Sequence, residues 1–136
     1  MPGPFPPNTL PAQRALCSIQ TTDPTSLAPA LDALYAAFWT KGLPIGEPRV
    51  VEDALAGVFG RERAREIVAG TAEQGVKKLL NENTQKALES GAFGLPWFVA
   101  RDGEGREDVF FGFDRLGEVV GFLGLGEGAD GVKALL

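Results

Sequence analysis

Residues 91–115 read GAFGLPWFVARDGEGREDVFFGFDR, and this stretch decides the fold of the chain. It holds two short apolar runs, 97–100 and 109–111, whose aromatic and β-branched residues are typical of strands. The residues between them, 102–105, read Asp-Gly-Glu-Gly and have the composition of a tight turn. The stretch therefore predicts a β-hairpin.

Helices are expected on both sides of the hairpin. Gly91 is expected to end a preceding helix in the left-handed conformation. Asp114 is expected to cap a final helix, and the apolar residues of that helix fall on one face: Leu116, Val119, Val120 and Leu123. An isolated hairpin is only marginally stable in water. Both strands are so apolar that covering one face alone would leave apolar side chains exposed on the other. We therefore expect an apolar face or edge of the hairpin that can pair with other chains.

The residues before the hairpin carry the signals of several helices. Apolar periodicity and breaking residues predict helices over about 8–18, 26–41, 48–58, 61–68 and 71–90. Asn8 and Ser26 are expected to cap the first two helices. Thr71 and Gln74 fit a capping box for the last one. The chain thus reads as a helical block followed by strand, strand and helix.

The charge of the chain excludes several kinds of partner. Thirteen Lys and Arg residues stand against 18 Asp and Glu residues, giving a net charge of −5. Phosphate neutralisation dominates affinity for nucleic acid, so we expect no nucleic-acid partner. Arginines stand at 61, 63 and 65, and glutamates stand at 62 and 66. This alternation of charge is typical of a solvated helix face rather than an anion-binding site. No apolar stretch approaches the roughly 18 to 20 residues of a membrane-spanning helix, so no membrane partner is expected.

Two scarce residue types limit the chemistry. The chain has no histidine, which excludes Ser-His and Cys-His nucleophilic pairs and any zinc site that needs histidine. We expect no metal. Its single cysteine, Cys17, cannot form an internal disulfide and reads as a small buried apolar residue rather than a nucleophile.

The motifs around the hairpin resemble a known family. The sequence GAFGLP before a strand, Gly112-Phe113-Asp114-Arg115 before the last helix and PPNTLPAQRAL at 6–16 occur in a characteristic order. In that combination they resemble the kappa-class glutathione transferases and the related 2-hydroxychromene-2-carboxylate isomerases, which belong to the DsbA-like branch of the thioredoxin fold. The resemblance implies a partial α/β thioredoxin-like fold: an inserted all-α block, then a β-hairpin and a C-terminal helix.

This fold divides the chain into four segments. They are a Pro-rich extended lead-in at 1–7, the inserted helical region at 8–90, the C-terminal half of the thioredoxin-like domain at 91–125 and a flexible tail at 126–136.

The resemblance also implies a glutathione site. The Leu95–Pro96 peptide bond is expected to be cis, with the backbone N–H and C=O of Leu95 pairing with the cysteinyl backbone of glutathione. Phe113 and Asp114 are expected to bind the γ-glutamyl end, through backbone donors and through the Asp114 carboxylate against the ammonium group. The family usually has serine where this chain has Phe113. The contact of the serine hydroxyl with glutathione is therefore lost, and only the backbone N–H donor remains. The alternatives are that Leu95-Pro96 is a plain turn and that Asp114 is only a cap.

The family begins with a strand and a serine that hydrogen-bonds the glutathione sulfur. Residues 1–7 stand where that module should have ended, and Ser18 lies in a predicted helix, so we expect no catalytic residue in this chain. The expected function is glutathione transfer to electrophiles, with peroxide reduction as a further activity, impaired by the missing module. The alternatives are a glutathione-dependent isomerase of the 2-hydroxychromene-2-carboxylate type and a non-catalytic fragment or interaction remnant.

The resemblance implies partners and a location as well. The expected ligands are glutathione and small electrophiles, and the chain is expected to be a homodimer or prone to aggregation. The family implies an intracellular protein of mitochondria or peroxisomes, although MPGPFPP at the N-terminus has no features of a targeting signal.

Overall fold

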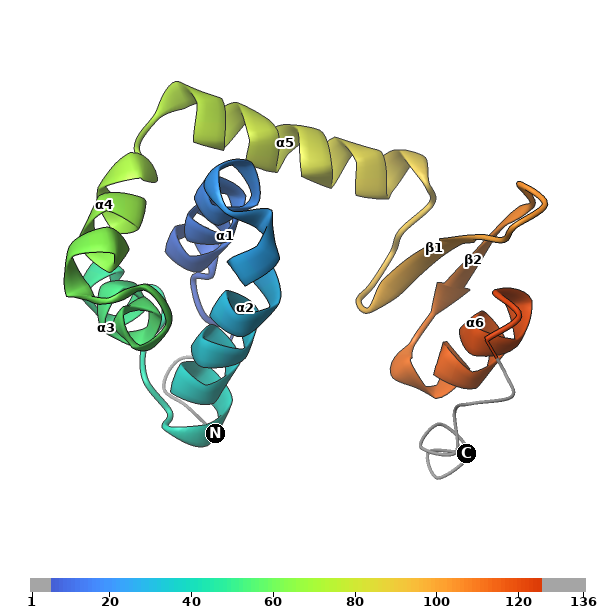
Figure 1. Ribbon diagram of the computed structural model, residues 1–136, viewed down its shortest axis with the longest axis horizontal. Helices are drawn as coiled ribbons and strands as arrows, with labels where there is room; N and C mark the ends of the chain where they lie inside the picture. Colours follow the sequence, from blue (N-terminus) through green and yellow to red (C-terminus); the bar gives the residue numbers. More distant parts are fainter. Residues whose placement is uncertain (1–5, 126–136) are drawn as a thin grey trace. The chain divides into compact units, whose positions relative to one another are not determined.

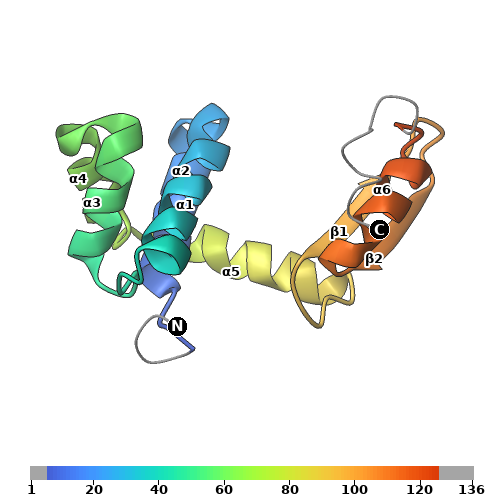
Figure 2. The ribbon, with the colours of Figure 1, turned by 90° about the horizontal axis from the view of Figure 1, so that it is seen from below.

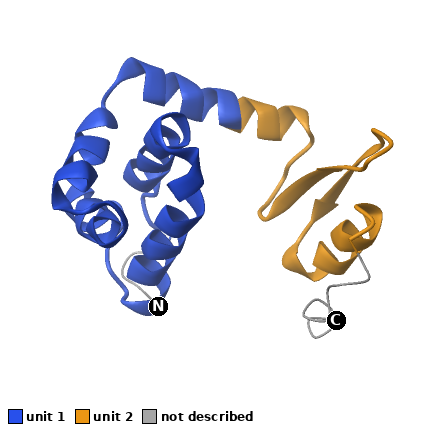
Figure 3. Cartoon of the chain, in the orientation of Figure 1, with its two compact units in different colours: residues 1–83 blue, residues 84–136 orange. Residues whose placement is uncertain are grey.

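The computed structural model describes residues 6–125, which divide into two compact units at 83/84, so that 6–83 belong to the first and 84–125 to the second (Figure 3). Six α-helices, two strands and three short helical turns follow one another in this part of the chain. Their bounds are α1 Leu10–Thr22, η1 Pro24–Ser26, α2 Leu27–Tyr35, η2 Ala36–Thr40, α3 Pro48–Phe59, α4 Arg61–Gly70, α5 Gln74–Glu89, β1 Trp97–Arg101, β2 Glu107–Phe111, η3 Phe113–Arg115 and α6 Leu116–Phe122. The predicted tail at 126–136 and most of the predicted lead-in lie outside the described residues.

The first unit is a helical block around one apolar core. α1 and α2 lie together, and α3 packs beside α4 (Figures 1 and 2). Ile19, Val51 and Leu55 are the largest side chains with no appreciable exposure. They come from α1 and α3, whose apolar residues recur every three to four positions and so form one buried stripe on each helix.

The first helix begins close to its predicted start but ends later. Its N-cap is Thr9 rather than Asn8, although the Asn8 Oδ1 accepts a hydrogen bond of 3.1 Å from the Leu10 N–H. α1 ends at Thr22, beyond the predicted residue 18, and the hydroxyls of Thr21 and Thr22 both donate to the Ser18 carbonyl at 2.9 Å. Beyond the predicted end, Ile19 is fully buried in the core whereas residues 20–22 are exposed, so the burial of Ile19 and the two threonine hydrogen bonds accompany the longer helix.

Ser26 precedes α2, but its side chain does not cap that helix. The hydroxyls of Thr25 and Ser26 instead donate to the Asp23 carboxylate at 2.7 and 2.6 Å, and these hydrogen bonds close the turn η1. They also lower the pKa of Asp23, with Ser26 the larger cause.

The capping box predicted for Thr71 and Gln74 is wrong. The Thr71 hydroxyl donates to the Val68 carbonyl at 2.7 Å and so satisfies the end of α4, and α5 begins only at Gln74. A threonine between two helices can bond to either one, and here the helix that precedes it takes the bond. α5 ends before Gly91, whose φ of +86° is the predicted left-handed stop.

The second unit contains the predicted hairpin, which is confirmed. β1 and β2 are antiparallel in the register Trp97↔Phe111, Phe98↔Phe110, Val99↔Val109, Ala100↔Asp108 and Arg101↔Glu107. The turn is held by the Asp102 carboxylate, which accepts hydrogen bonds from the backbone of Glu104 and Arg106, both at 2.9 Å. α6 lies along one face of the hairpin (Figures 1 and 2), where Ala100 and Val119 are buried.

Asp114 is not the cap of the last helix, and this prediction is wrong. It lies inside the 3₁₀ turn η3, which Gly112 precedes, and α6 follows after Arg115 without a side-chain cap. The helix is also short, because it spans only seven residues. Within residues 6–125, no helix combines the length and the apolar character needed to cross a bilayer.

Candidate functional site

The four predicted site residues flank the same end of the hairpin. Leu95 and Pro96 directly precede β1, whereas Phe113 and Asp114 follow β2 after one glycine. Because the strands are antiparallel, these two segments lie next to each other. The Gly112 N–H donates to the Pro96 carbonyl at 3.0 Å and ties the segments together. We call residues 95–96 and 112–114 the open end of the hairpin.

Leu95 is strongly exposed at the open end. The residue is 83% exposed, and the Leu95–Pro96 peptide bond is cis. Among residues 6–125, neither the N–H nor the C=O of Leu95 pairs with another backbone group. A free amide and carbonyl next to a strand can pair with the backbone of an extended peptide, as an added strand would.

Aromatic side chains support the loop that leads to Leu95. The Phe93 ring contacts Trp97 and Phe111, with centroid separations of 5.5 and 4.6 Å. The Trp97 indole N–H donates to the Ser90 hydroxyl at 3.0 Å, at the end of the preceding helix. A Cβ at Gly94 would lie 2.6 Å from the Phe111 ring, so this position has room only for glycine. The loop is therefore held against the hairpin by contacts with Trp97 and Phe111.

Asp114 presents its carboxylate to solvent, since its side chain is 79% exposed. Its nearest cation is Arg115, whose Nε lies 3.7 Å from the carboxylate. That guanidinium is also bonded to Glu118, and the pKa of Arg115 is raised mainly by Glu118. Because Arg115 is shared between two carboxylates, the Asp114 carboxylate keeps the capacity to bind a further cation such as an ammonium group.

Around Asp114 the structure adds Glu118, which the sequence motif did not include, and shows why Gly112 stands there. Gly112 has a φ of +99°, and a Cβ on it would collide with the Asp114 carboxylate. The pairing of Arg115 with Glu118, three positions apart on a helix, is a spacing that sequence alone could have indicated. Phe113 lies beside Asp114 with an exposed apolar side chain.

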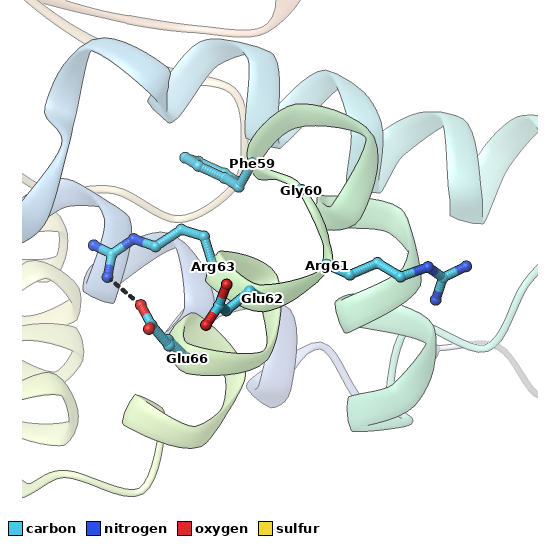
Figure 4. Close-up of a pocket in the computed structure, with 6 residues that line it drawn as sticks. All are labelled: Phe59, Gly60, Arg61, Glu62, Arg63 and Glu66. Carbon is cyan, nitrogen blue, oxygen red and sulfur yellow. Dashed lines mark hydrogen bonds and ion pairs between the residues drawn. The ribbon is translucent and has the colours of Figure 1, made fainter.

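A hollow lies at the turn between α3 and α4. Figure 4 shows its lining: Phe59, Gly60, Arg61, Glu62, Arg63 and Glu66. Arg63 points toward Glu66, and the two form an ion pair of 2.9 Å, whereas Arg61 points away (Figure 4) and lies 3.6 Å from Asp53. A second hollow nearby has the same character, with Arg65 3.5 Å from Glu52. Each of these arginines has an acidic partner, so the region is a balanced charged surface rather than an anion site.

Cys17 lies in the core of the helical unit. Burial raises the pKa of its thiol, and a weak hydrogen bond from the Asn83 amide, 3.9 Å from the sulfur, only partly opposes that effect. Ser18, beside it in α1, is buried as well. Neither side chain reaches solvent, so neither can serve as an accessible nucleophile. Among residues 6–125, no group of three or more acidic or cysteine side chains is arranged to hold a metal ion.

Comparison with known proteins agrees with the architecture. Residues 2–124 match the family described as DSBA-like thioredoxin domain. The chain is 33% identical over 112 residues to glutathione S-transferase kappa 2 of Caenorhabditis elegans, covering 82% of this chain and 49% of that protein. It is 32% identical over 117 residues to glutathione S-transferase kappa 1 of Homo sapiens, covering 85% of this chain and 51% of the relative.

A third relative, glutathione S-transferase kappa 1 of Rattus norvegicus, is 30% identical over 120 residues. The chain spans about half the length of the curated relatives it matches. The match over almost the whole chain, together with the hairpin, the C-terminal helix and the helical block that precedes them, shows that the chain belongs to the DSBA-like thioredoxin domain family and is similar there to kappa-class glutathione transferases.

Proposed function

We propose that the chain binds glutathione at the open end of the hairpin and acts in the transfer of glutathione to small electrophiles. One observation carries this proposal. The Gly112–Pro96 hydrogen bond joins the segment with the unpaired peptide group of Leu95 to the segment with the exposed carboxylate of Asp114. The chain that carries this arrangement is similar in sequence to proteins named as kappa-class glutathione transferases.

Glutathione matches these groups chemically. Its cysteinyl unit offers a backbone N–H and C=O, which Leu95 can pair with in the manner of an added strand. Its γ-glutamyl end carries an ammonium group, for which the Asp114 carboxylate is the partner. Its γ-glutamyl carboxylate can accept hydrogen bonds from the backbone N–H groups of Phe113 and Asp114. Pro96 fixes the loop, since its carbonyl holds Gly112.

We expect binding with little turnover by the chain in isolation. The thiolate of glutathione is the reactive form, and free thiols ionise near a pKa of about 8.5, so catalysis requires a group that favours the thiolate. The chain has no histidine, and its cysteine is buried in the helical unit. A transferase is preferred to an isomerase of aromatic carboxylates because the relatives carry transferase names.

We also propose that the chain forms a homodimer.

The test is the change in melting temperature caused by glutathione. A ligand of the folded state stabilises it by RT ln(1 + [L]/Kd), about 2.7 kcal/mol when the ligand is at 100 times its Kd. Asp114→Asn keeps the size and polarity of the side chain but removes its charge. We expect wild type to show a concentration-dependent rise that Asp114→Asn loses. Since Asp114 caps no helix, both Asp114→Asn and Asp114→Ala should leave the melting temperature without ligand nearly unchanged.

Asp108→Asn is the matched control, because Asp108 is an exposed carboxylate of the same unit away from the open end. It should keep the full response to glutathione. Equal responses in wild type and Asp114→Asn would remove Asp114 from the site. No response in wild type at millimolar glutathione would contradict the proposed function.

A further inference from the structure

The two units differ greatly in how much apolar side chain they bury. The first unit has a cluster of buried apolar residues drawn from α1 to α4, with Val51 and Leu55 among the least exposed. Among residues 84–125, by contrast, only Ala100 and Val119 are buried, at 6% and 7% exposure. Burial of apolar surface is the main favourable contribution to folding, so the second unit has a much weaker driving force to fold than the first.

The apolar side chains of the hairpin do not make up for this small core. Val99 is 49% exposed, and Val109 and Phe111 are each 42% exposed. Units of about 40 residues usually need a disulfide, a metal or a binding partner in addition to their core. The single cysteine of the chain, Cys17, lies in the first unit, so no disulfide links two parts of the second. Binding of a ligand is then a direct way to stabilise the second unit.

α5 runs through the boundary between the two units, and its attachments differ on the two sides of that boundary. On the side of the first unit, Val76 is buried. There the Asn83 amide also donates to Gln20 Oε1 at 3.1 Å and, weakly, to Cys17 Sγ at 3.9 Å. On the other side, none of residues 84–89 is buried. A short helical segment without a buried face is unstable in water, so α5 can unwind as far as Asn83 without opening the core of the first unit.

The groups proposed to bind glutathione all belong to the second unit. Leu95 and Pro96 precede β1, and Phe113 and Asp114 follow β2. The two segments are joined by the hydrogen bond from Gly112 to Pro96, which exists only while the hairpin is formed. A ligand that bonds to both segments therefore binds the folded second unit and not the unfolded one. Such a ligand shifts the folding equilibrium of the unit that holds its site.

We propose that glutathione controls the folding of the second unit. Without glutathione, the second unit opens repeatedly while the first unit stays folded, and bound glutathione holds the second unit closed. This inference rests on the proposed function, which supplies the ligand, and goes beyond it by making the order of the hairpin depend on that ligand. The ligand then assembles its own site, and its apparent affinity is reduced by the fraction of chains whose second unit is open.

Amide hydrogen exchange of the wild-type chain measures the opening of each unit separately, because a hydrogen-bonded amide exchanges only when its segment opens. The strand segments 97–101 and 107–111 report the second unit. The helical segments 51–56 and 64–68 report the first unit. After correction for intrinsic rates, we expect the strand amides without ligand to exchange at least about tenfold faster than the helical ones.

Addition of glutathione should affect the two units differently. At 100 times its Kd, glutathione should slow exchange of the strand amides by up to about 100-fold, because opening then requires release of the ligand. The amides of α3 and α4 should keep their rates. Asp114→Asn, which removes the proposed partner of the ammonium group, should lose the slowing by glutathione and keep the fast exchange of the hairpin without it.

Two matched substitutions test whether the units open independently. Val51→Ala and Val119→Ala each remove the same atoms from a buried position, one in each unit. Val119→Ala should speed exchange of the strand amides alone. Val51→Ala should speed exchange of α3 and α4 and leave the strand amides unchanged. The comparison within wild type stands even if one variant fails to fold.

Equal exchange rates of the strands and of α3 and α4 without ligand would overturn the inference, because the chain would then open as one unit. Glutathione that raises the melting temperature but slows exchange in both units alike would also overturn it, while the proposed glutathione site would stand. Glutathione that changes neither the melting temperature nor the exchange of the strands would contradict the proposed function together with this inference. The two kinds of failure are thus distinguishable.

Discussion

Gly112 has a backbone conformation that favours glycine, and the side chain of Asp114 packs against its Cα. Its φ is +99°, and a Cβ there would collide with the Asp114 carboxylate. The site therefore depends on a residue that has no side chain. At the same open end, Gly94 allows the Phe111 ring to lie against the loop.

We expect Gly112→Ala to destabilise the second unit by about 1–3 kcal/mol, because alanine must adopt a strained φ and displace the Asp114 carboxylate. Urea unfolding followed by Trp97 fluorescence in a Trp39→Phe background measures this change. Gly103→Ala is the control, since Gly103 lies in the hairpin turn with open space around its Cα and no left-handed φ. Equal effects of the two substitutions would show that Gly112 carries no special strain.

Cys17 gives a second prediction at the scale of one residue. Burial raises the pKa of its thiol, so the native chain holds less thiolate at pH 8 than the unfolded chain. We expect an aromatic disulfide reagent to label native Cys17 at least roughly tenfold more slowly than in 6 M urea. The raised pKa contributes stability that is fully present below the unfolded pKa and lost as the pH rises toward the folded pKa. Fast labelling of the native chain would contradict the buried position.

At the scale of elements, two glycines at the end of α3 have opposite roles. Gly57 lies inside the helix with open space around its Cα, whereas Gly60 has a φ of +79° and separates α3 from α4. The Gly60 N–H donates to the Ala56 carbonyl at 2.9 Å and ends the helix. The same residue type thus weakens one helix position and makes the next turn possible.

We expect Gly57→Ala to raise the free energy of unfolding by about 0.5–1 kcal/mol, because alanine loses less backbone entropy in a helix. Gly60→Ala should lower it by about 1 kcal/mol or more, since alanine is unfavourable in the left-handed region. Chemical denaturation followed by far-UV circular dichroism measures both. A gain in stability from Gly60→Ala as well as from Gly57→Ala would contradict the expected cost of a side chain at the turn of Gly60.

The elements also show which features local sequence signals are sufficient to predict. The hairpin was predicted because strand composition, turn residues and a stop signal at Gly91 all lie within 25 positions of one another and agree. The predicted caps at Thr71 and Asp114 were wrong for different reasons. The Thr71 hydroxyl bonds the Val68 carbonyl of the preceding helix, because a side chain between two helices has backbone partners in both. Asp114 lies inside the 3₁₀ turn η3 rather than directly before a helix.

At the scale of the whole molecule, the absence of histidine from the sequence governs the pH dependence of stability. Histidine is the side chain whose ordinary pKa lies between pH 5 and 8. Within residues 6–125, the carboxylates whose pKa is lowered are Asp23, which accepts hydrogen bonds from Ser26 and Thr25, and Asp102, for which the largest cause is the hydrogen bond from Arg106. A depressed pKa contributes stability that is present above the unfolded value, about 3.9 for aspartate, and lost as the pH falls through the folded value.

We therefore expect the urea midpoint to be nearly constant from about pH 5.5 to 7.5 and to fall below about pH 4. Asp102→Asn should flatten part of the acid decline, because its amide does not titrate. Measurements of unfolding from pH 3 to 8 test this. A step in stability centred near pH 6.5 would contradict it, since no histidine is available to produce one.

The sequence by itself determined the order of the elements and the hairpin. These follow from local properties: alternating apolar residues, helical periodicity and glycines at left-handed positions. It also determined the family, through motifs that keep their order along the chain.

Only the tertiary structure decided which face of the hairpin α6 covers and how the hydrogen bond from Gly112 to Pro96 joins the two segments of its open end. It also showed that the aromatic cluster forms from Phe93, Trp97 and Phe111. The physical reason is that these features depend on contacts between segments that are separate in sequence. Their energies come from packing and from competition for hydrogen-bond partners, which no local pattern encodes.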